Sequence, residues 1–436
     1  MFSPTFPEVH LPHLADVPLP PMQAVRLHHP ASEPVADIAA AVDEALAKSR
    51  QLVDLARGSS VAVAVGSRGI ADIPKVVAAA VKHLKQRDFA PFVVPAMGSH
   101  GGATAEGQAG VLAHLGVTEA TVGAPIRATM ETVEYGATLH GIPCRFDKNA
   151  AEADAVLCIN RVKSHTSFDR PIESGLTKLI AVGLGKQAGA QNVHRIGPRG
   201  YTEVLPALAR IAIEHSPIAF GIALVENANE QLVLIEGVEP DDFAATDERL
   251  LKHAKSLTAR LPFEHIDGLV VEWIGKEISG AGMDPAVVGR VGIRSVEDPA
   301  KPFVNKLAIL GVSEDSYGNA VGLGNADYTT RKVVNGIDLM PMYMNSITAA
   351  GTEGARIPAV LPDDRTVLRA MVATCWRADL ENVRLCQIRS TLHLNQILIS
   401  PALATEIEGR DDVEVLSDPA PLDFAADGGL LTRCPI

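Results

Sequence analysis

The chain has 436 residues, enough for two or three domains with sizeable hydrophobic cores. Hydrophobic residues make up 47% and charged residues 21%, which excludes fibrous, collagen-like and disordered classes. Lys and Arg total 39 against 52 Asp and Glu, so the net charge is −13, which argues against nucleic acid or an anionic membrane as the main partner. The five cysteines form no Cys-x-x-Cys pair, and we find no signal peptide and no apolar run of about eighteen residues, so we expect a cytoplasmic protein.

The first half of the chain alternates short apolar runs with segments of helical periodicity. This alternation predicts buried strands and helices that form a mainly parallel sheet covered on both faces. After a Pro-rich lead-in, we expect helices over 30–57, 74–84, 104–115 and 201–215, and strands over 60–65, 91–96, 153–160, 218–225 and 231–235.

A charged helix over 241–259 runs into Leu261-Pro262, and we place a domain boundary there because proline stops a helix. The sequence therefore predicts two α/β domains with mainly parallel sheets, 1–258 and 259–436, the last residues being allowed to return to the first domain. Two such domains form an interdomain cleft, the usual place for a ligand. In the second domain we expect strands over 268–273, 306–311, 383–388 and 396–400, and a helix over 365–375.

Three loops of the first domain follow the carboxyl ends of predicted strands, where parallel α/β sheets bind ligands. These loops hold Arg68, His100 and His165. The loop of His100 also contains Gly98 and Gly101 and precedes a helix, so its backbone N–H groups favour an anion. A plainer interpretation is a tight turn with a solvated histidine.

A second glycine-rich stretch, dense in basic residues, follows the third strand. It contains Ser174-Gly175-Leu176-Thr177-Lys178 and, sixteen residues after the lysine, His194. Glycine-rich polar loops often build small-ligand sites, although a solvated basic loop is the plainer interpretation. Histidines here suit proton transfer near neutral pH or ligation of nickel, copper, iron or zinc. The spacing does not select among these metals.

From residue 61 to residue 194 the sequence resembles the nickel-dependent lactate racemase family. Members of that family carry a nickel-pincer nucleotide, pyridinium-3-thioamide-5-thiocarboxylic acid mononucleotide, in which two sulfurs and one carbon bind nickel. The resemblance implies that Lys178 anchors this cofactor covalently and that His194 completes the nickel coordination. The other residues that we assign to the cofactor are Ser174, Gly175, Gly98 and Gly101.

The resemblance also implies which residues act on the substrate. His100 and His165 correspond to the acid/base pair, and Arg68 corresponds to an arginine of the substrate or cofactor site. Lys276, in the second domain, is a further candidate for binding the substrate. The anchor segment has Leu-Thr where the family usually has Gly-Arg, which leaves the particular 2-hydroxy acid open.

Racemisation of a 2-hydroxy acid requires histidine and arginine side chains of the kind found here. The C2 proton of a 2-hydroxy acid is barely acidic beside an ionised carboxylate, and moving the C2 hydrogen as a hydride avoids a carbanion. A histidine takes the hydroxyl proton, and a second base must stand on the opposite face, roles that suit His100 and His165. Arg68 suits the substrate carboxylate, and a neutral imidazole such as His194 suits the fourth position of square-planar nickel.

The sequence therefore predicts a racemase or epimerase of a small 2-hydroxy acid that depends on the nickel-pincer nucleotide. The resemblance also implies contact with the enzymes that make this cofactor, and the oligomeric state is left open. One alternative is a zinc-dependent hydrolase or lyase that uses His100, His165 and His194 around one metal ion. Another alternative is a non-catalytic protein that binds an organic anion.

Overall fold

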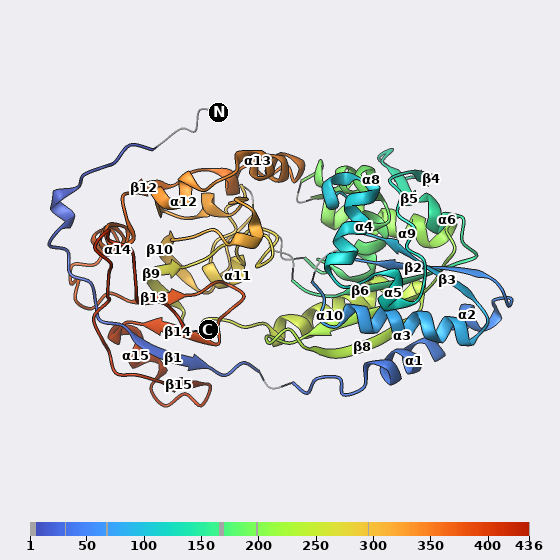
Figure 1. Ribbon diagram of the computed structural model, residues 1–436, viewed down its shortest axis with the longest axis horizontal. Helices are drawn as coiled ribbons and strands as arrows, with labels where there is room; N and C mark the ends of the chain where they lie inside the picture. The colour runs from blue at the N-terminus through green and yellow to red at the C-terminus, as the bar shows by residue number, and fades with distance from the viewer. Residues whose placement is uncertain are drawn as a thin grey trace. The chain divides into compact units, whose positions relative to one another are not determined.

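The computed structural model describes residues 6–30, 32–66, 69–164, 170–197, 199–294 and 296–435. The chain divides into two compact units, Pro30–Thr258 and a second unit formed by Met1–His29 and Ala259–Ile436 (Figure 1). The change of unit after Thr258 coincides with the boundary placed at residue 258. Each unit combines helices with a mostly parallel sheet, so the α/β class predicted from the alternating pattern is confirmed.

A five-stranded sheet in the order β3-β2-β6-β7-β8 forms the centre of the unit Pro30–Thr258. β2 pairs in parallel with β3 and with β6, β6 pairs in parallel with β7, and β8 closes one edge in the antiparallel direction. The bounds are β2 (Ser60–Val65), β3 (Ala90–Pro95), β6 (Ala155–Arg161), β7 (Ile218–Glu226) and β8 (Leu232–Val238).

Helices cover both faces of this sheet because successive side chains of a strand point to opposite faces. On β2, Val61 and Val63 join an apolar cluster with α1 and α3, whereas Ala62 and Ala64 join a second cluster with α9 and α10. Figure 1 shows α1 and α3 on one side of the strands and α8 and α9 on the other. The bounds are α1 (Ile38–Ala47), α2 (Arg50–Asp54), α3 (Ile73–Gln86), α4 (Ala105–His114), α5 (Glu119–Val122), α6 (Lys148–Ala151), α7 (Gly175–Lys178), α8 (Lys186–His194), α9 (Leu205–His215) and α10 (Phe243–Leu257), with a hairpin of β4 (Thr132–Ala137) and β5 (Pro143–Asp147).

Two predicted helices differ from the structure. The expected helix over 30–57 is two helices, because Asp37 caps the start of α1 through the amide of Ala40 and Ser49 caps the start of α2 through the amide of Leu52. The helix expected from residue 201 begins as a π-helical turn, η4 (Gly200–Val204), and continues as α9. A second π-helical turn, η3 (Leu179–Gly183), follows α7 directly.

The second unit contains an eight-stranded sheet in the order β12-β11-β10-β9-β13-β14-β1-β15. The part from β12 to β13 is parallel, and β14, β1 and β15 continue it in antiparallel pairs. The bounds are β1 (Gln23–Leu27), β9 (His265–Val271), β10 (Phe303–Ile309), β11 (Tyr328–Thr330), β12 (Ala359–Leu361), β13 (Leu385–Ile388), β14 (Gln396–Ile399), β15 (Val413–Val415), α11 (Pro285–Val288), α12 (Arg331–Asn335), α13 (Leu339–Thr348), α14 (Asp364–Ala373) and α15 (Pro401–Ile407).

Residues 6–29, predicted from the sequence to belong to the first domain, pack with the second unit. The physical reason is strand β1, which lies between β14 and β15 and whose Val25 is fully buried. Because prolines surround this short strand, the sequence predicted an irregular N-terminal segment here and no strand. The last residues stay with the second unit and do not return to the first.

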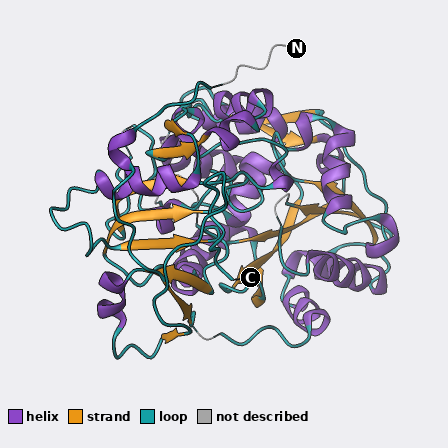
Figure 2. Ribbon diagram, turned by 60° about the vertical axis from the view of Figure 1, so that its left-hand side comes forward, coloured by secondary structure: helices purple, strands orange, loops and turns teal. Residues whose placement is uncertain are grey.

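Figure 2 shows the distribution of helices and strands over both units. Within the described ranges, none of the helices combines the length and the apolar character that a membrane crossing requires.

Candidate active site

The strand order brings three loops to one edge of the five-stranded sheet. β3, β2 and β6 are parallel neighbours, so the segments that follow them start side by side at their carboxyl ends. The segment after β2 carries Arg68, the segment after β3 carries His100, and the segment after β6 carries His165. Arg68 and His165 themselves lie outside the described residues. His100 is described and exposed.

The bases of two of these loops are held by hydrogen bonds. The amide of Lys163 donates to Ser174 Oγ at 2.7 Å, and Ser174 Oγ donates to the carbonyl of Lys163 at 2.5 Å. Asn160 Nδ2 donates to the carbonyl of Gly175 at 2.7 Å. These contacts hold residues 160–163 close to residues 174–175. After β2, the amide of Ala71 donates to Glu226 Oε1 at 2.6 Å.

Gly175 and Asp247 shape the turn that leads to Lys178. Gly175 has φ +86, and a Cβ atom placed on it would lie 2.0 Å from Asp247 Oδ1, so only glycine fits there. Asp247 accepts hydrogen bonds from the amides of Leu176 (3.0 Å) and Thr177 (2.7 Å). Burial raises the pKa of the Asp247 carboxyl to about 6, although these amides lower it in part. We call residues 174–183 the anchor turn.

Lys178 and His194 lie against the same aromatic ring, that of Tyr201. Lys178 Nζ is 4.9 Å from the centroid of the Tyr201 ring, within the range of a cation–π contact. The rings of His194 and Tyr201 are 5.8 Å apart between centroids and tilted by 59°. Both Lys178 and His194 are half-buried, and Lys178 Nζ also donates to the carbonyl of Glu173 at 3.4 Å. The structure therefore brings together the predicted anchor and the predicted metal ligand.

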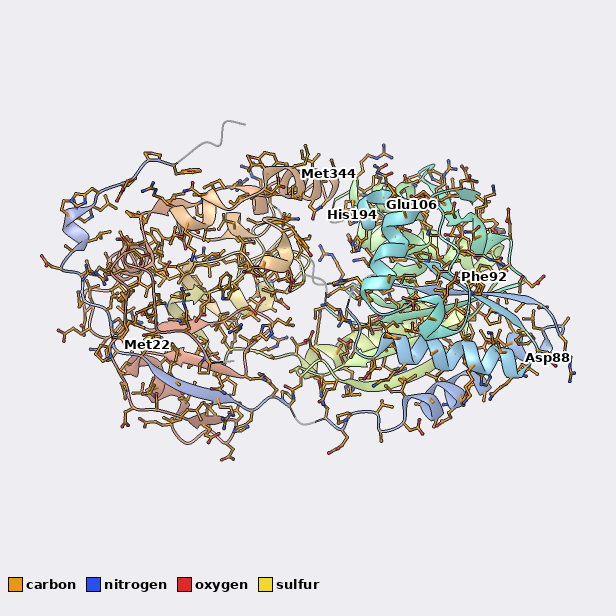
Figure 3. The ribbon with its side chains drawn as sticks, viewed as in Figure 1. Met22, Asp88, Phe92, Glu106, His194 and Met344 are labelled. Atoms are coloured by element: carbon orange, nitrogen blue, oxygen red, sulfur yellow. The ribbon has the colours of Figure 1, made fainter. Side chains whose placement is uncertain are left out.

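Two π-helical turns border the cluster of Lys178, His194 and Tyr201. Such turns are frequent at functional sites. η3 begins immediately after Lys178, and η4 contains Tyr201. In Figure 3, His194 lies at the end of its unit opposite Asp88, which comes shortly before the amino end of β3. The cluster is thus on the side of the carboxyl ends of the strands. Tyr201 was not among the site residues predicted from the sequence, where its signal was an aromatic residue directly after a glycine-rich basic stretch.

The loop of His100 contacts the anchor turn. The amide of Gly98 donates to the carbonyl of Gly183 at 3.1 Å. Gly98 has φ +60, and a Cβ atom there would lie 3.3 Å from the carbonyl oxygen of Val182, so the close approach favours glycine. Gly101 lies in the short turn after His100 and packs against the backbone of α4.

Lys276 belongs to the second unit and follows β9. Its Nζ donates to the carbonyl of Gly280 at 2.6 Å, and its amide donates to Ser316 Oγ at 2.7 Å. Its place as a substrate residue, like the cleft between the domains, stays a prediction.

The zinc alternative requires His165, which is outside the described ranges. In the part of the chain that the structure does describe, no three His, Cys, Asp or Glu side chains gather as a metal site. This alternative is therefore untested. Lys178 and His194 do suit a tethered nickel cofactor chemically, since an amine can form the covalent link and an imidazole is a nickel ligand.

These features define an α/β protein in which glycine-rich loops with histidine and lysine side chains lie together at the carboxyl edge of a parallel sheet. Residues 13–197 match the family model described as the lactate racemase N-terminal domain, which confirms the family resemblance of the motifs. Among solved structures, the chain is similar to the lactate racemase apoprotein from Thermoanaerobacterium thermosaccharolyticum, with 12% identity, a TM-score of 0.45, and coverage of 84% of this chain and 89% of that chain. The comparison with curated proteins finds no match.

Proposed function

We propose that this protein is a racemase or epimerase of a small 2-hydroxy acid. The observation that carries the proposal is the convergence of Lys178 Nζ and the His194 ring on Tyr201. The match of residues 13–197 to the lactate racemase N-terminal domain supports it. If the segment were only a solvated basic loop, this convergence would have no functional reason.

In this proposal Lys178 holds a nickel-pincer nucleotide covalently and His194 contributes an imidazole nitrogen to its nickel. When bound, this group supplies an acceptor for the C2 hydrogen as hydride. The ring of Tyr201, whose centroid is 4.9 Å from Lys178 Nζ, orients the amine. Asp247 keeps the turn before Lys178 in shape through the amides of Leu176 and Thr177.

The two bases come from loops on either side of β2. β3, which precedes the loop of His100, and β6, which precedes the loop of His165, flank β2 in the sheet. His100 takes the hydroxyl proton of one enantiomer, and His165 performs the same step for the other. Arg68, from the loop between them, pairs with the substrate carboxylate.

The test is intact-mass and nickel analysis of protein produced together with the cofactor-synthesis enzymes, followed by chiral analysis of a panel of 2-hydroxy acids incubated with the protein in D2O. We expect a covalent mass increment, about one nickel for each increment, and inversion of at least one acid with its C2 hydrogen retained, because a hydride held by the cofactor does not exchange with solvent. Lys178→Ala should lose the increment, and the matched variant Lys82→Ala, on the exposed side of α3, should keep it. Wild-type protein without an increment would contradict the tethering, and tightly bound zinc instead would favour the hydrolase.

A further inference from the structure

A lysine at the start of α8 is almost completely buried. The side chain of Lys186 is 1% exposed, and its Nζ lies 2.7 Å from Asp147 Oδ2, whose side chain is fully buried. Lys186 also has φ +56, a left-handed conformation that is unfavourable for a non-glycine residue. A lysine held in this way, inside the core and with a strained backbone, calls for a reason beyond packing.

The ammonium of Lys186 is connected to the loop of His100. Nζ donates to the carbonyl of Pro95 at 2.5 Å, at the end of β3, and to Gln108 Oε1 at 3.1 Å. Gln108, on α4 and fully buried, donates from Nε2 to the carbonyls of Gly98 (2.8 Å) and His100 (3.4 Å). The network therefore holds both ends of the segment from Pro95 to His100.

The same network reaches the helix that carries His194. α8 begins at Lys186 and ends at His194, so the position of Lys186 also sets the position of this helix. Asp147 ends β5 and caps α6 through the amide of Ala150 at 2.9 Å. Four elements thus meet at one buried ammonium: β3, α4, β5 and α8, all labelled in Figure 1.

We propose that Lys186, paired with Asp147 and bridged by Gln108, is a positioning residue that holds the His100 loop in register with the helix of His194. Only the statement that His100 serves catalysis rests on the proposed function. A buried ion pair is weak evidence for stability, since apolar residues of similar size often replace one without loss. Its value here lies in directional bonds to backbone carbonyls that an apolar side chain cannot make.

The experiment uses the full chain and compares Gln108→Met with Gln86→Met, a matched glutamine on the exposed side of α3. Gln108→Met keeps the size of the side chain but removes its bonds to Gly98 and His100. We expect amide hydrogen exchange of the peptide spanning 96–104 to rise about tenfold, with β2 and β7 unchanged, because that segment opens locally. In protein that racemises a 2-hydroxy acid, kcat should fall about tenfold or more while KM changes little, because a small misplacement of a catalytic base is costly.

Because Lys186→Met leaves a buried carboxylate without its cation, the double variant Lys186→Met/Asp147→Asn serves as a second test. The side-chain amide oxygen that this variant carries at position 147 can still accept from the amide of Ala150, so the protein should fold and show the same increase in exchange. Unchanged exchange over 96–104 in both Gln108→Met and the double variant would overturn the proposal. If exchange rises but the wild type inverts none of the 2-hydroxy acids, the positioning role stands and the proposed function fails.

Discussion

The anchor turn (residues 174–183) and the His100 loop (residues 97–104) lie at the same edge of one sheet, and each is supported by a buried carboxylate. Behind the anchor turn, Asp247 accepts hydrogen bonds from two successive amides, those of Leu176 and Thr177. Behind the His100 loop, Asp147 faces the ammonium of Lys186 at 2.7 Å. One support is therefore local to a single turn, and the other joins elements that are distant in the chain.

This difference matters for how each region responds to pH and substitution. A carboxylate held by amides needs no cation, but its burial raises the pKa of Asp247 to about 6, where it changes charge near neutral pH. Burial also raises the pKa of Asp147, and Lys186 opposes that shift by favouring the carboxylate. The anchor turn should thus respond mainly to pH, and the His100 loop mainly to loss of the ion pair.

The largest expected effect is a loss of turnover when the His100 loop is changed, with the covalent cofactor on the anchor turn kept. His100→Ala should lower turnover about 10²- to 10⁴-fold, because a positioned acid/base group contributes that much. The mass increment on Lys178 should stay, since the anchor turn is intact. Racemisation rates and intact mass measure the two effects, and His114→Ala, at the exposed end of α4, is the control. Full turnover without His100 would remove it from catalysis.

Breaking the ion pair should be the next largest effect. Lys186→Met should lower the free energy of unfolding by about 3–5 kcal/mol, because it strands the Asp147 carboxylate in the core. Adding Asp147→Asn should recover much of that loss. Urea unfolding measures both, with Lys82→Met as the exposed control. A single variant as stable as the wild type would contradict the buried pair.

The pH response of the anchor turn gives a third, intermediate effect. Because the folded-state pKa of Asp247 is raised from 3.8 to about 6, the protonated form is favoured by folding, and the stability it contributes is lost as pH rises through this window. Relative to Asp247→Asn, the wild type should therefore lose on the order of 3 kcal/mol of unfolding free energy between about pH 4 and pH 7.

Urea titrations of both proteins at matched pH values measure this difference, and Asp54→Asn, at the exposed end of α2, controls for the loss of a carboxylate. A difference between the wild type and Asp247→Asn that stays constant with pH would show that Asp247 does not titrate in this range.

The smallest expected effect concerns Tyr201, which contacts both Lys178 and His194. Tyr201→Leu should weaken the placement of the Lys178 ammonium by about 1 kcal/mol, the size of a cation–π contact, and slow covalent loading. Tyr201→Phe keeps the aromatic face and should load at nearly the normal rate. The fraction of protein with the mass increment over time measures this, and equal loading of Tyr201→Leu and wild type would remove the ring from the anchor site.

Local patterns determined much of the fold and the outline of the site. The alternating apolar run over 60–65 predicted β2 to the residue, and the runs over 218–225 and 396–400 predicted β7 and β14 to within a residue at either end. The motifs around Lys178 and His194 indicated the resemblance to the lactate racemase family, because spacing and residue type are properties of the chain itself. Strand β1 was not predicted, because a short strand among prolines has no clear period in the sequence. Its pairing with β14 and β15 defines it in the structure.

What only the tertiary structure decided is which side chains meet. Asp247 lies 71 residues from Leu176, and Lys186 lies 91 residues from Pro95, yet each pair is joined by a hydrogen bond. The π-helical turns that bring Tyr201 to Lys178 and His194 have no sequence period of their own. Sequence periodicity records which face of an element is apolar, whereas the partner of a buried polar group depends on how distant elements pack, and that information exists only in the folded chain.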